Sequence, residues 1–292
     1  MSRLGAFATP GLHLPRRPLG FRVQAKPSLQ SPLYQSCRRV CAGQQVTLIH
    51  INMLAVHAEA IGSLLRPADL LEAQHQFAVK AIDQEQLKAI EDRAVNDAIG
   101  LQENVGLEIV SDGEMRRQSF QSQMTAAVSG FGEHDLDAFL WGDWYDGSGV
   151  FKKARPEQLG VVSRLERRRY LSVDEFVYLN AKTRRTPKIT LPSAGLWANF
   201  WSARYSKGAY PTLDSFLADV VQILRDEVAE LDRLGAGYIQ IDAPHYGLLL
   251  DPKTRLFYES QGWSFDQWLS LGIELDNAVM AGFPRVTFGL HV

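Results

Sequence analysis

The feature that most constrains the fold of this 292-residue chain is an alternation of strand-like and helix-like segments after about residue 56. Short apolar runs typical of buried strands are separated by longer segments with apolar residues at helical spacing. Such alternation predicts parallel pairing, because a connection between two parallel strands needs a crossover, usually a helix. We therefore expect an α/β protein.

Six strands and five helices are expected. The predicted strands are residues 58–63, 107–112, 159–165, 188–192, 238–242 and 286–290. One predicted helix begins at Pro67 and another begins near Ser172. The other three cover residues 84–105, 213–234 and 264–280. Residues 115–158 are rich in Gly, Trp and charge, and we expect an insertion over one face.

Polar residues lie at or just after the ends of the predicted strands: Ser63, Asp112 with Glu114, Ser193, Asp242 and His291. In a (β/α)8 TIM barrel such strand ends meet at one mouth. A doubly wound sheet would instead show a glycine-rich phosphate loop after its first strand, and residues 61–65 (IGSLL) do not match one. We therefore expect a TIM barrel that is incomplete, with about six βα units and the last two missing.

The first 55 residues differ from the remainder. They contain several arginines and no acidic residue, since the first is Glu59. This composition is typical of an organellar transit peptide; a disordered tail or a wrongly assigned start codon are the alternatives. Two regions are thus expected: a disordered or targeting-like segment at 1–55 and a partial barrel at 56–292. The expected location is cytoplasmic, or mitochondrial if 1–55 is a transit peptide.

Charge and cysteine usage exclude several classes of protein. The net charge is −2, which argues against a nucleic-acid binder that works by counterion release. No apolar run approaches the roughly 20 residues of a membrane span. The two cysteines, Cys37 and Cys41, lie in the atypical N-terminal segment, so a disulfide-stapled secreted fold is not expected.

Four segments occur in a recognisable order. They are AIGSLLRP (60–67), VSDGEMRRQSF (110–120), YIQIDAP (238–244) and FGLH (288–291). Together they resemble the catalytic barrel of cobalamin-independent methionine synthase, and more closely its stand-alone single-domain relatives. The resemblance spans about residue 56 to the end.

The resemblance implies a (β/α)8 barrel with a zinc ion that activates a thiol. It implies methyl transfer from a folate to homocysteine, or alkyl transfer to another thiol. A thiol with a pKa near 8.5 is a poor nucleophile at neutral pH, and coordination to zinc deprotonates it. The expected partners are therefore a small thiol and a methyl donor such as a methyl-folate.

The resemblance also assigns roles to particular residues. Ile61 and Ser63 would contact the amino-acid part of the substrate through backbone and hydroxyl. Glu114 would hold its ammonium group, and Asp242 would do the same from the opposite wall. His245, just after the strand at 238–242, would contact substrate or act as an acid or base.

Each residue also has a purely structural explanation. Asp112-Gly113 is a common turn pair. The alternative for Glu114 is an ion pair with Arg116 or Arg117, and the alternative for Asp242 is that it orients the backbone before Pro244.

His291 is a zinc ligand by resemblance. In the family this strand ends in His-x-Cys, whereas here His291 precedes Val292, and no cysteine follows Cys41. One histidine cannot hold zinc, which needs three or four protein ligands. The main hypothesis is therefore a zinc-dependent methyl- or alkyltransferase, and the alternative is an inactive truncated remnant of the same family. A metal-free barrel of the uroporphyrinogen decarboxylase superfamily is a third interpretation.

Overall fold

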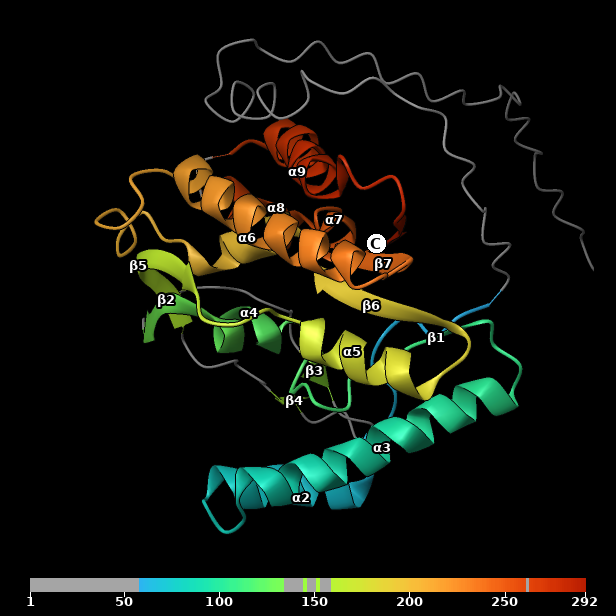
Figure 1. Ribbon diagram of the computed structural model, residues 1–292. Helices are drawn as coiled ribbons and strands as arrows, with labels where there is room; N and C mark the ends of the chain where they lie inside the picture. The colour runs from blue at the N-terminus through green and yellow to red at the C-terminus, as the bar shows by residue number, and fades with distance from the viewer. Residues whose placement is uncertain (1–57, 134–143, 146–150, 153–158, 261–262) are drawn as a thin grey trace, which may run out of the picture.

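The computed structural model describes residues 58–133, 144–145, 151–152, 159–260 and 263–292 (Figure 1). The region predicted at 1–55 lies outside the described residues. The helices are α2 (Ala68–Ala78), α3 (Gln84–Asn104), α4 (Ser122–Ala127), α5 (Val173–Lys182), the 3-10 helix η1 (Ala194–Phe200), α6 (Leu213–Arg233), α7 (His245–Leu248), α8 (Pro252–Ser260) and α9 (Phe265–Met280). The strands are β1 (Ile109–Val110), β2 (Val128–Glu133), β3 (Trp144–Tyr145), β4 (Phe151–Lys152), β5 (Leu159–Arg167), β6 (Thr186–Pro192), β7 (Tyr238–Asp242) and β8 (Thr287–His291).

The central sheet is parallel and has the order β1-β6-β7-β8. Helices α2 and α3 lie at one end of the molecule, and α6, α8 and α9 lie at the other (Figure 1). Within the described residues neither β1 nor β8 has a second neighbour, so the barrel is not closed. The predicted α/β class with a parallel, incomplete barrel is confirmed.

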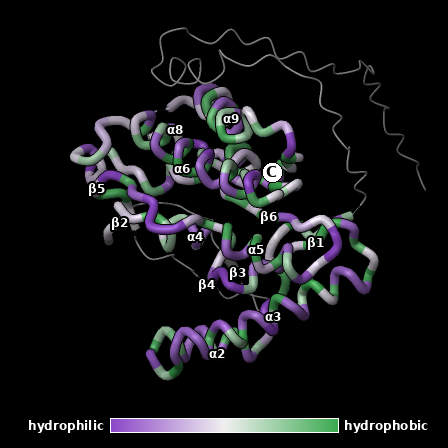
Figure 2. Tube along the Cα trace, viewed as in Figure 1, coloured by the Kyte–Doolittle hydropathy of each residue, from purple (hydrophilic) through white to green (hydrophobic). Residues whose placement is uncertain are grey.

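The helices begin where the sequence supplies caps. The side chains of Thr212 and Ser264 accept hydrogen bonds from the third amides of α6 and α9, and Asp83 does the same for α3. Each of these caps is reciprocated by the third residue of the helix, which satisfies two otherwise free amides. In α6 the apolar residues recur on one side, so hydrophobic and hydrophilic stretches alternate along it (Figure 2). The helices predicted at 84–105, 213–234 and 264–280 are thus confirmed.

The strand predicted at 159–165 forms, but not in the parallel sheet. It is part of β5, which pairs antiparallel with β2, with Val161 opposite Phe131. The prediction that it is a βα strand of the barrel is therefore wrong. The physical reason is that a short apolar run does not encode its partner, and the region taken as an insertion supplies a nearer one in β2.

The strand predicted at 58–63 is not formed. This segment has no ladder hydrogen bonds, and side chains from the sheet bond its carbonyls instead. Lys188 donates to the carbonyls of Ala60 and Ile61, and Gln240 also donates to that of Ile61. The segment consequently crosses the inner face of the sheet rather than extending its edge.

The two faces of the sheet differ in chemistry. One face contributes to the hydrophobic core with Ile189, Leu191, Ile239 and Ile241. The opposite face carries Lys188, Thr190, Gln240 and Asp242, all buried. Because side chains alternate along a strand, this polar set is the interior of the partial barrel.

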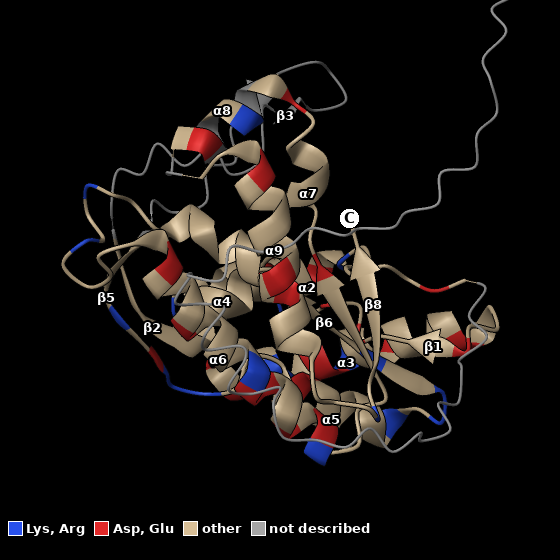
Figure 3. Ribbon diagram, turned by 90° about the horizontal axis from the view of Figure 1, so that it is seen from above, with Lys and Arg blue, Asp and Glu red and all other residues tan. Residues whose placement is uncertain are grey.

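Charged residues of both signs are interspersed over the helices and loops, and β8 carries none (Figure 3). Within the described part of the chain, no helix is both long and apolar enough to cross a membrane.

Candidate active site at the carboxyl ends of the parallel strands

A tight turn after β1 presents Glu114. Gly113 has φ of 67° and Glu114 has φ of 55°, both in the left-handed region. For a residue other than glycine this conformation costs roughly 1–2 kcal/mol. The Oδ1 atom of Asp112 stabilises the turn by accepting the amide of Glu114 at 2.9 Å. The turn expected for Asp112-Gly113 is confirmed, and it carries backbone strain of the kind that gathers at functional sites.

Side-chain contacts fix the strand that leads into this turn. The amide of Gln102 in α3 accepts from the backbone N–H of Ser111 at 3.0 Å and donates to its carbonyl at 2.8 Å. Gln102 therefore takes the place of a neighbouring strand at this edge of the sheet. The Leu64 amide donates to the Gly113 carbonyl at 3.0 Å, which brings the loop containing Ser63 against the turn.

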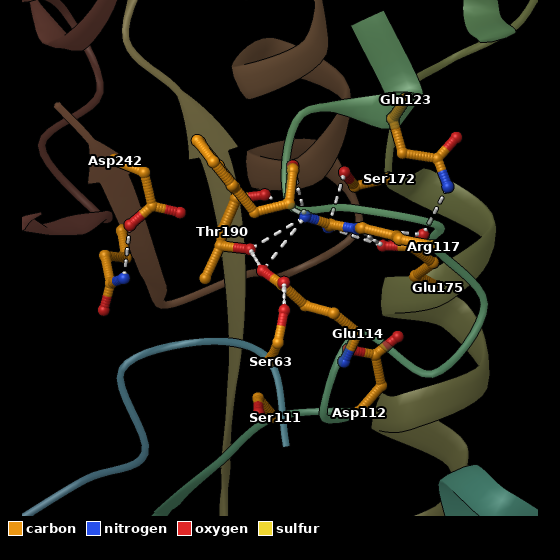
Figure 4. Close-up of polar contacts among 12 residues, drawn as sticks. Ser63, Ser111, Asp112, Glu114, Arg117, Gln123, Ser172, Glu175, Thr190 and Asp242 are labelled. Carbon is orange, nitrogen blue, oxygen red and sulfur yellow. Dashed lines mark hydrogen bonds and ion pairs between the residues drawn. The ribbon is translucent and has the colours of Figure 1, made fainter. Parts of the chain in front are cut away.

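Three donors hold the buried Glu114 carboxylate (Figure 4). The Ser63 hydroxyl donates to Oε2. The Thr190 hydroxyl lies 2.6 Å from Oε1, and Nη1 of Arg117 lies 3.3 Å from the same oxygen. Gly62 leaves room for this carboxylate, since a Cβ there would lie 3.2 Å from Oε1. The structure thus brings Ser63 and Glu114 together, as predicted, and also forms the Glu114–Arg117 ion pair that was the structural alternative.

Arg117 is fully buried and ion-paired with Glu175 of α5. Its Nε atom lies 3.2 and 3.0 Å from the two carboxylate oxygens of Glu175, and Nη2 lies 2.6 Å from one of them. Nη2 also donates to Ser172 and to the Thr190 carbonyl, at 3.2 and 3.1 Å. The surrounding carboxylates raise the pKa of Arg117 against the opposing effect of its burial.

Asp242 is the last residue of strand β7, and it lies on the side of Thr190 opposite to Glu114 (Figure 4). Its Oδ1 atom accepts from Gln240 at 2.6 Å and lies 3.0 Å from Nδ1 of His291, its partner in the register of β7 and β8. Burial raises the pKa of Asp242, and the charge of Glu114 adds to the rise. The contacts with Gln240 and His291 oppose it.

Lys188 connects the N-terminal loop to the floor of the site. Its Nζ atom lies 2.8 Å from the side-chain oxygen of Gln240 and 3.3 Å from the carboxylate of Glu59. Burial lowers the pKa of Lys188, and Glu59 opposes that shift. Lys188 and Gln240 both donate to the Ile61 carbonyl, while the Ile61 side chain is exposed. The backbone of Ile61 is therefore fixed by the protein itself.

Negative charge exceeds positive charge in this cluster. Four carboxylates are buried: Asp112, Glu114, Glu175 and Asp242. The buried cations are Arg117, which pairs with Glu175, and Lys188, which pairs with Glu59. Burial raises the pKa of Asp112 to about 6, and the charge of Glu175 adds to the rise. The site therefore suits a ligand that carries a positive group.

The structure does not bring two of the predicted residues into this cluster. Neither ring nitrogen of His245 has a hydrogen-bond partner among the described residues, and burial lowers its pKa to about 3. The ring packs so closely on Gly195 that a Cβ there would lie 2.7 Å from Nε2. Ser193 donates to Asp276 at 2.7 and 2.9 Å and caps η1.

The residues that the structure describes do not make a zinc site. Within the described ranges, no group of three or more His, Cys, Asp or Glu side chains is placed to hold a metal ion. His291 has the carboxylate contact that metal-binding histidines often make through their second nitrogen. The described part of the chain does not complete a set of three ligands around it.

The sequence named Arg117 only as a candidate partner of Glu114, so the pairing of Arg117 with Glu175 was missed. Lys188, Thr190 and Gln240 were not singled out. The last three had a signal: they alternate with apolar residues in strands otherwise expected to be buried on both faces. The pairing of Arg117 with Glu175 had no sequence signal, because 58 positions separate the two residues.

By its fold and site, the protein is an α/β protein with a partial parallel barrel and buried carboxylates at its strand ends. Comparison with known protein families identifies the family to which this chain belongs. The sequence model described as cobalamin-independent synthase, catalytic domain, matches residues 56–266. The chain belongs to this family, which confirms the resemblance inferred from the four sequence segments.

Individual relatives are distant in sequence. The methionine synthase of Pyrococcus abyssi is 29% identical over 234 residues, which are 80% of this chain and 60% of that protein. The B12-independent methionine synthase of Shewanella, solved in complex with selenomethionine, has a TM-score of 0.52 at 21% identity, covering 72% of this chain and 53% of the other. A Listeria monocytogenes protein, described as a putative vitamin-B12 independent methionine synthase, has a TM-score of 0.61 at 18% identity, covering 82% and 66%. The chain thus spans about 60% of its curated relative, and the structures show a shared fold.

Proposed function

We propose that this chain is a methyl- or alkyltransferase to a thiol, and that Glu114 and Asp242 bind the ammonium group of the acceptor amino acid. The observation that carries the proposal is the excess of buried carboxylates over cations at the mouth. A buried carboxylate whose charge is not fully neutralised by the protein is stabilised when a ligand supplies a positive group.

The site supports a division of labour. Glu114 is held on one side of Thr190 and Asp242 on the other, so an ammonium group between them would meet an acceptor from each wall (Figure 4). Ser63 sits at the entrance with its hydroxyl on Glu114. Homocysteine is the proposed acceptor and a methyl-folate the proposed donor, in line with the family. The selenomethionine bound by the Shewanella relative is also an amino acid with an ammonium group.

The test is calorimetry of the purified chain with L-homocysteine and with 4-mercaptobutanoate, which lacks the amino group. The proposal predicts binding of the amino acid at least tenfold tighter, because a charge-assisted hydrogen bond contributes about 1.5–3 kcal/mol. Equal affinity for the two ligands, or no binding of either, would remove the support for an ammonium site.

The second candidate is an inactive member of the family that binds an amino acid without transferring a methyl group. It is favoured by the lack of a metal-binding cluster among the described residues. A methyl-transfer assay with added zinc separates the two. Turnover supports the transferase, whereas amino-acid binding without turnover supports the inactive form.

A further inference from the structure

We propose that Arg117 is a positioning residue for the Glu114 carboxylate. In this proposal Glu175 neutralises the positive charge of Arg117, so the negative charge of Glu114 stays available to a ligand cation. This inference rests on the proposed function. It assigns a task to two buried residues that lie behind the proposed ligand-binding carboxylate rather than in contact with the ligand.

The geometry of Arg117 is asymmetric. Its contacts with Glu175 involve two nitrogens and both carboxylate oxygens, the shortest at 2.6 Å. Its contact with Glu114 is a single one at 3.3 Å, from Nη1 to Oε1. Since the ion pair is stronger where the contacts are shorter and forked, most of the positive charge is matched by Glu175.

Glu114 is held mainly by neutral groups. The hydroxyls of Ser63 and Thr190 supply its two close hydrogen bonds. The Thr190 hydroxyl also lies 2.9 Å from Nη1 of Arg117, so one side chain touches both members of the pair. Neutral donors fix the direction of a carboxylate without cancelling its charge, which is what an ammonium-binding site requires.

Glu175 is itself anchored on the side away from Glu114. Its Oε1 atom accepts from the side-chain amide of Gln123 at 2.8 Å, and it lies in the first turn of α5, where a negative charge is favoured. The series Gln123–Glu175–Arg117–Glu114 therefore runs from α4 to the mouth (Figure 4). An arginine at its centre with all three nitrogens bonded has little freedom to swing toward Glu114.

The variant Glu175→Gln tests the inference. This variant keeps the shape of the side chain and removes the negative charge that pairs with Arg117. Arg117 should then form a closer ion pair with Glu114. The preference for L-homocysteine over 4-mercaptobutanoate should fall about tenfold, with the affinity for 4-mercaptobutanoate unchanged. The control is Glu227→Gln, also a buried glutamate, which caps the amides of Leu171 and Ser172. It should lower the unfolding temperature and leave the preference intact.

A crystal structure of ligand-free Glu175→Gln gives a readout that does not depend on the proposed function. The Arg117–Glu114 contact should shorten from 3.3 Å, whereas an unchanged contact would overturn the inference even if no amino acid binds to the wild type. If Glu175→Gln does not fold, Thr190→Val serves instead. It removes the shared hydroxyl and should reduce the same preference, and an unaltered preference in either folded variant contradicts the positioning role.

Discussion

His291 and Asp242 lie side by side at the ends of β8 and β7, with the imidazole Nδ1 3.0 Å from the carboxylate Oδ1. The contact orients the ring, and it leaves Nε2 as the nitrogen that would face a metal or ligand. It also joins the residue that resembles a zinc ligand to one that is proposed to bind the ammonium group.

This relationship predicts weak zinc binding by the 292-residue chain. Zinc needs three or four protein ligands, and the described residues offer only His291 with one carboxylate beside it. Purified protein should contain well under one zinc per chain by mass spectrometry of the metal, and His291→Ala should not change that content. Tight one-to-one zinc that is lost in His291→Ala would show that a complete ligand set exists.

Asp112 should destabilise the fold as the pH rises. Its pKa is raised from 3.8 to about 6 in the folded state, so the folded protein binds the proton more tightly than the unfolded chain does. The resulting stabilisation is present below pH 4 and is lost between pH 4 and 6, an effect of about 3 kcal/mol. Asp112→Asn should gain free energy of unfolding relative to wild type across this window, measured by urea denaturation at pH 4.5 and 7. A constant difference between the two proteins would contradict the assignment.

His245 should destabilise the fold as the pH falls, the reverse of the effect of Asp112. Its pKa is lowered from 6.5 to about 3 by burial, so the unfolded chain binds the proton first when the pH falls. Stability is complete above pH 6.5 and should fall by about 2 kcal/mol by pH 5. His245→Met, which fills the site without a titrating group, should remove this loss in thermal melts at the two pH values. If the variant loses stability as steeply as the wild type, His245 is not the group responsible.

Lys188 should be required to hold the loop before α2. Lys188→Met removes a buried cation, so the Ala60 carbonyl loses the donor that Lys188 supplies and Glu59 loses its ion pair. The Ile61 carbonyl keeps only its hydrogen bond from Gln240. The free energy of unfolding should fall by about 3 kcal/mol, and trypsin should cleave at Arg66 sooner. The exposed Lys207→Met is the control and should change stability by less than about 0.5 kcal/mol. Equal behaviour of the two variants would exclude the proposed role of Lys188.

The sequence predicted the parts of the fold whose signal is local. The apolar period of α6, the buried run of β7 and the turn at Asp112-Gly113 each specify their structure within a few residues. The partner of β5 was predicted wrongly, because strand pairing depends on which other strand lies nearby.

The same distinction applies to the site. Ser63, Glu114, Asp242 and His291 are at strand ends or loops with recognisable sequence around them. Arg117 and Glu175 were missed as a pair because a buried ion pair is formed by packing between distant elements. His245 resembles a site residue in sequence, but the close packing on Gly195 that encloses it is visible only in three dimensions.

Glu114 is proposed to be the charge that recognises an amino-acid ligand. The most direct measurement is the ratio of affinities for L-homocysteine and 4-mercaptobutanoate in wild type and in Glu114→Gln, by calorimetry at pH 7. The Glu114→Gln variant should bind homocysteine about 10-fold or more weakly, since a hydrogen bond to a charged group contributes about 1.5–3 kcal/mol. It should bind 4-mercaptobutanoate as the wild type does. A Glu114→Gln variant that keeps the wild-type preference for homocysteine would show that Glu114 does not recognise the ammonium group.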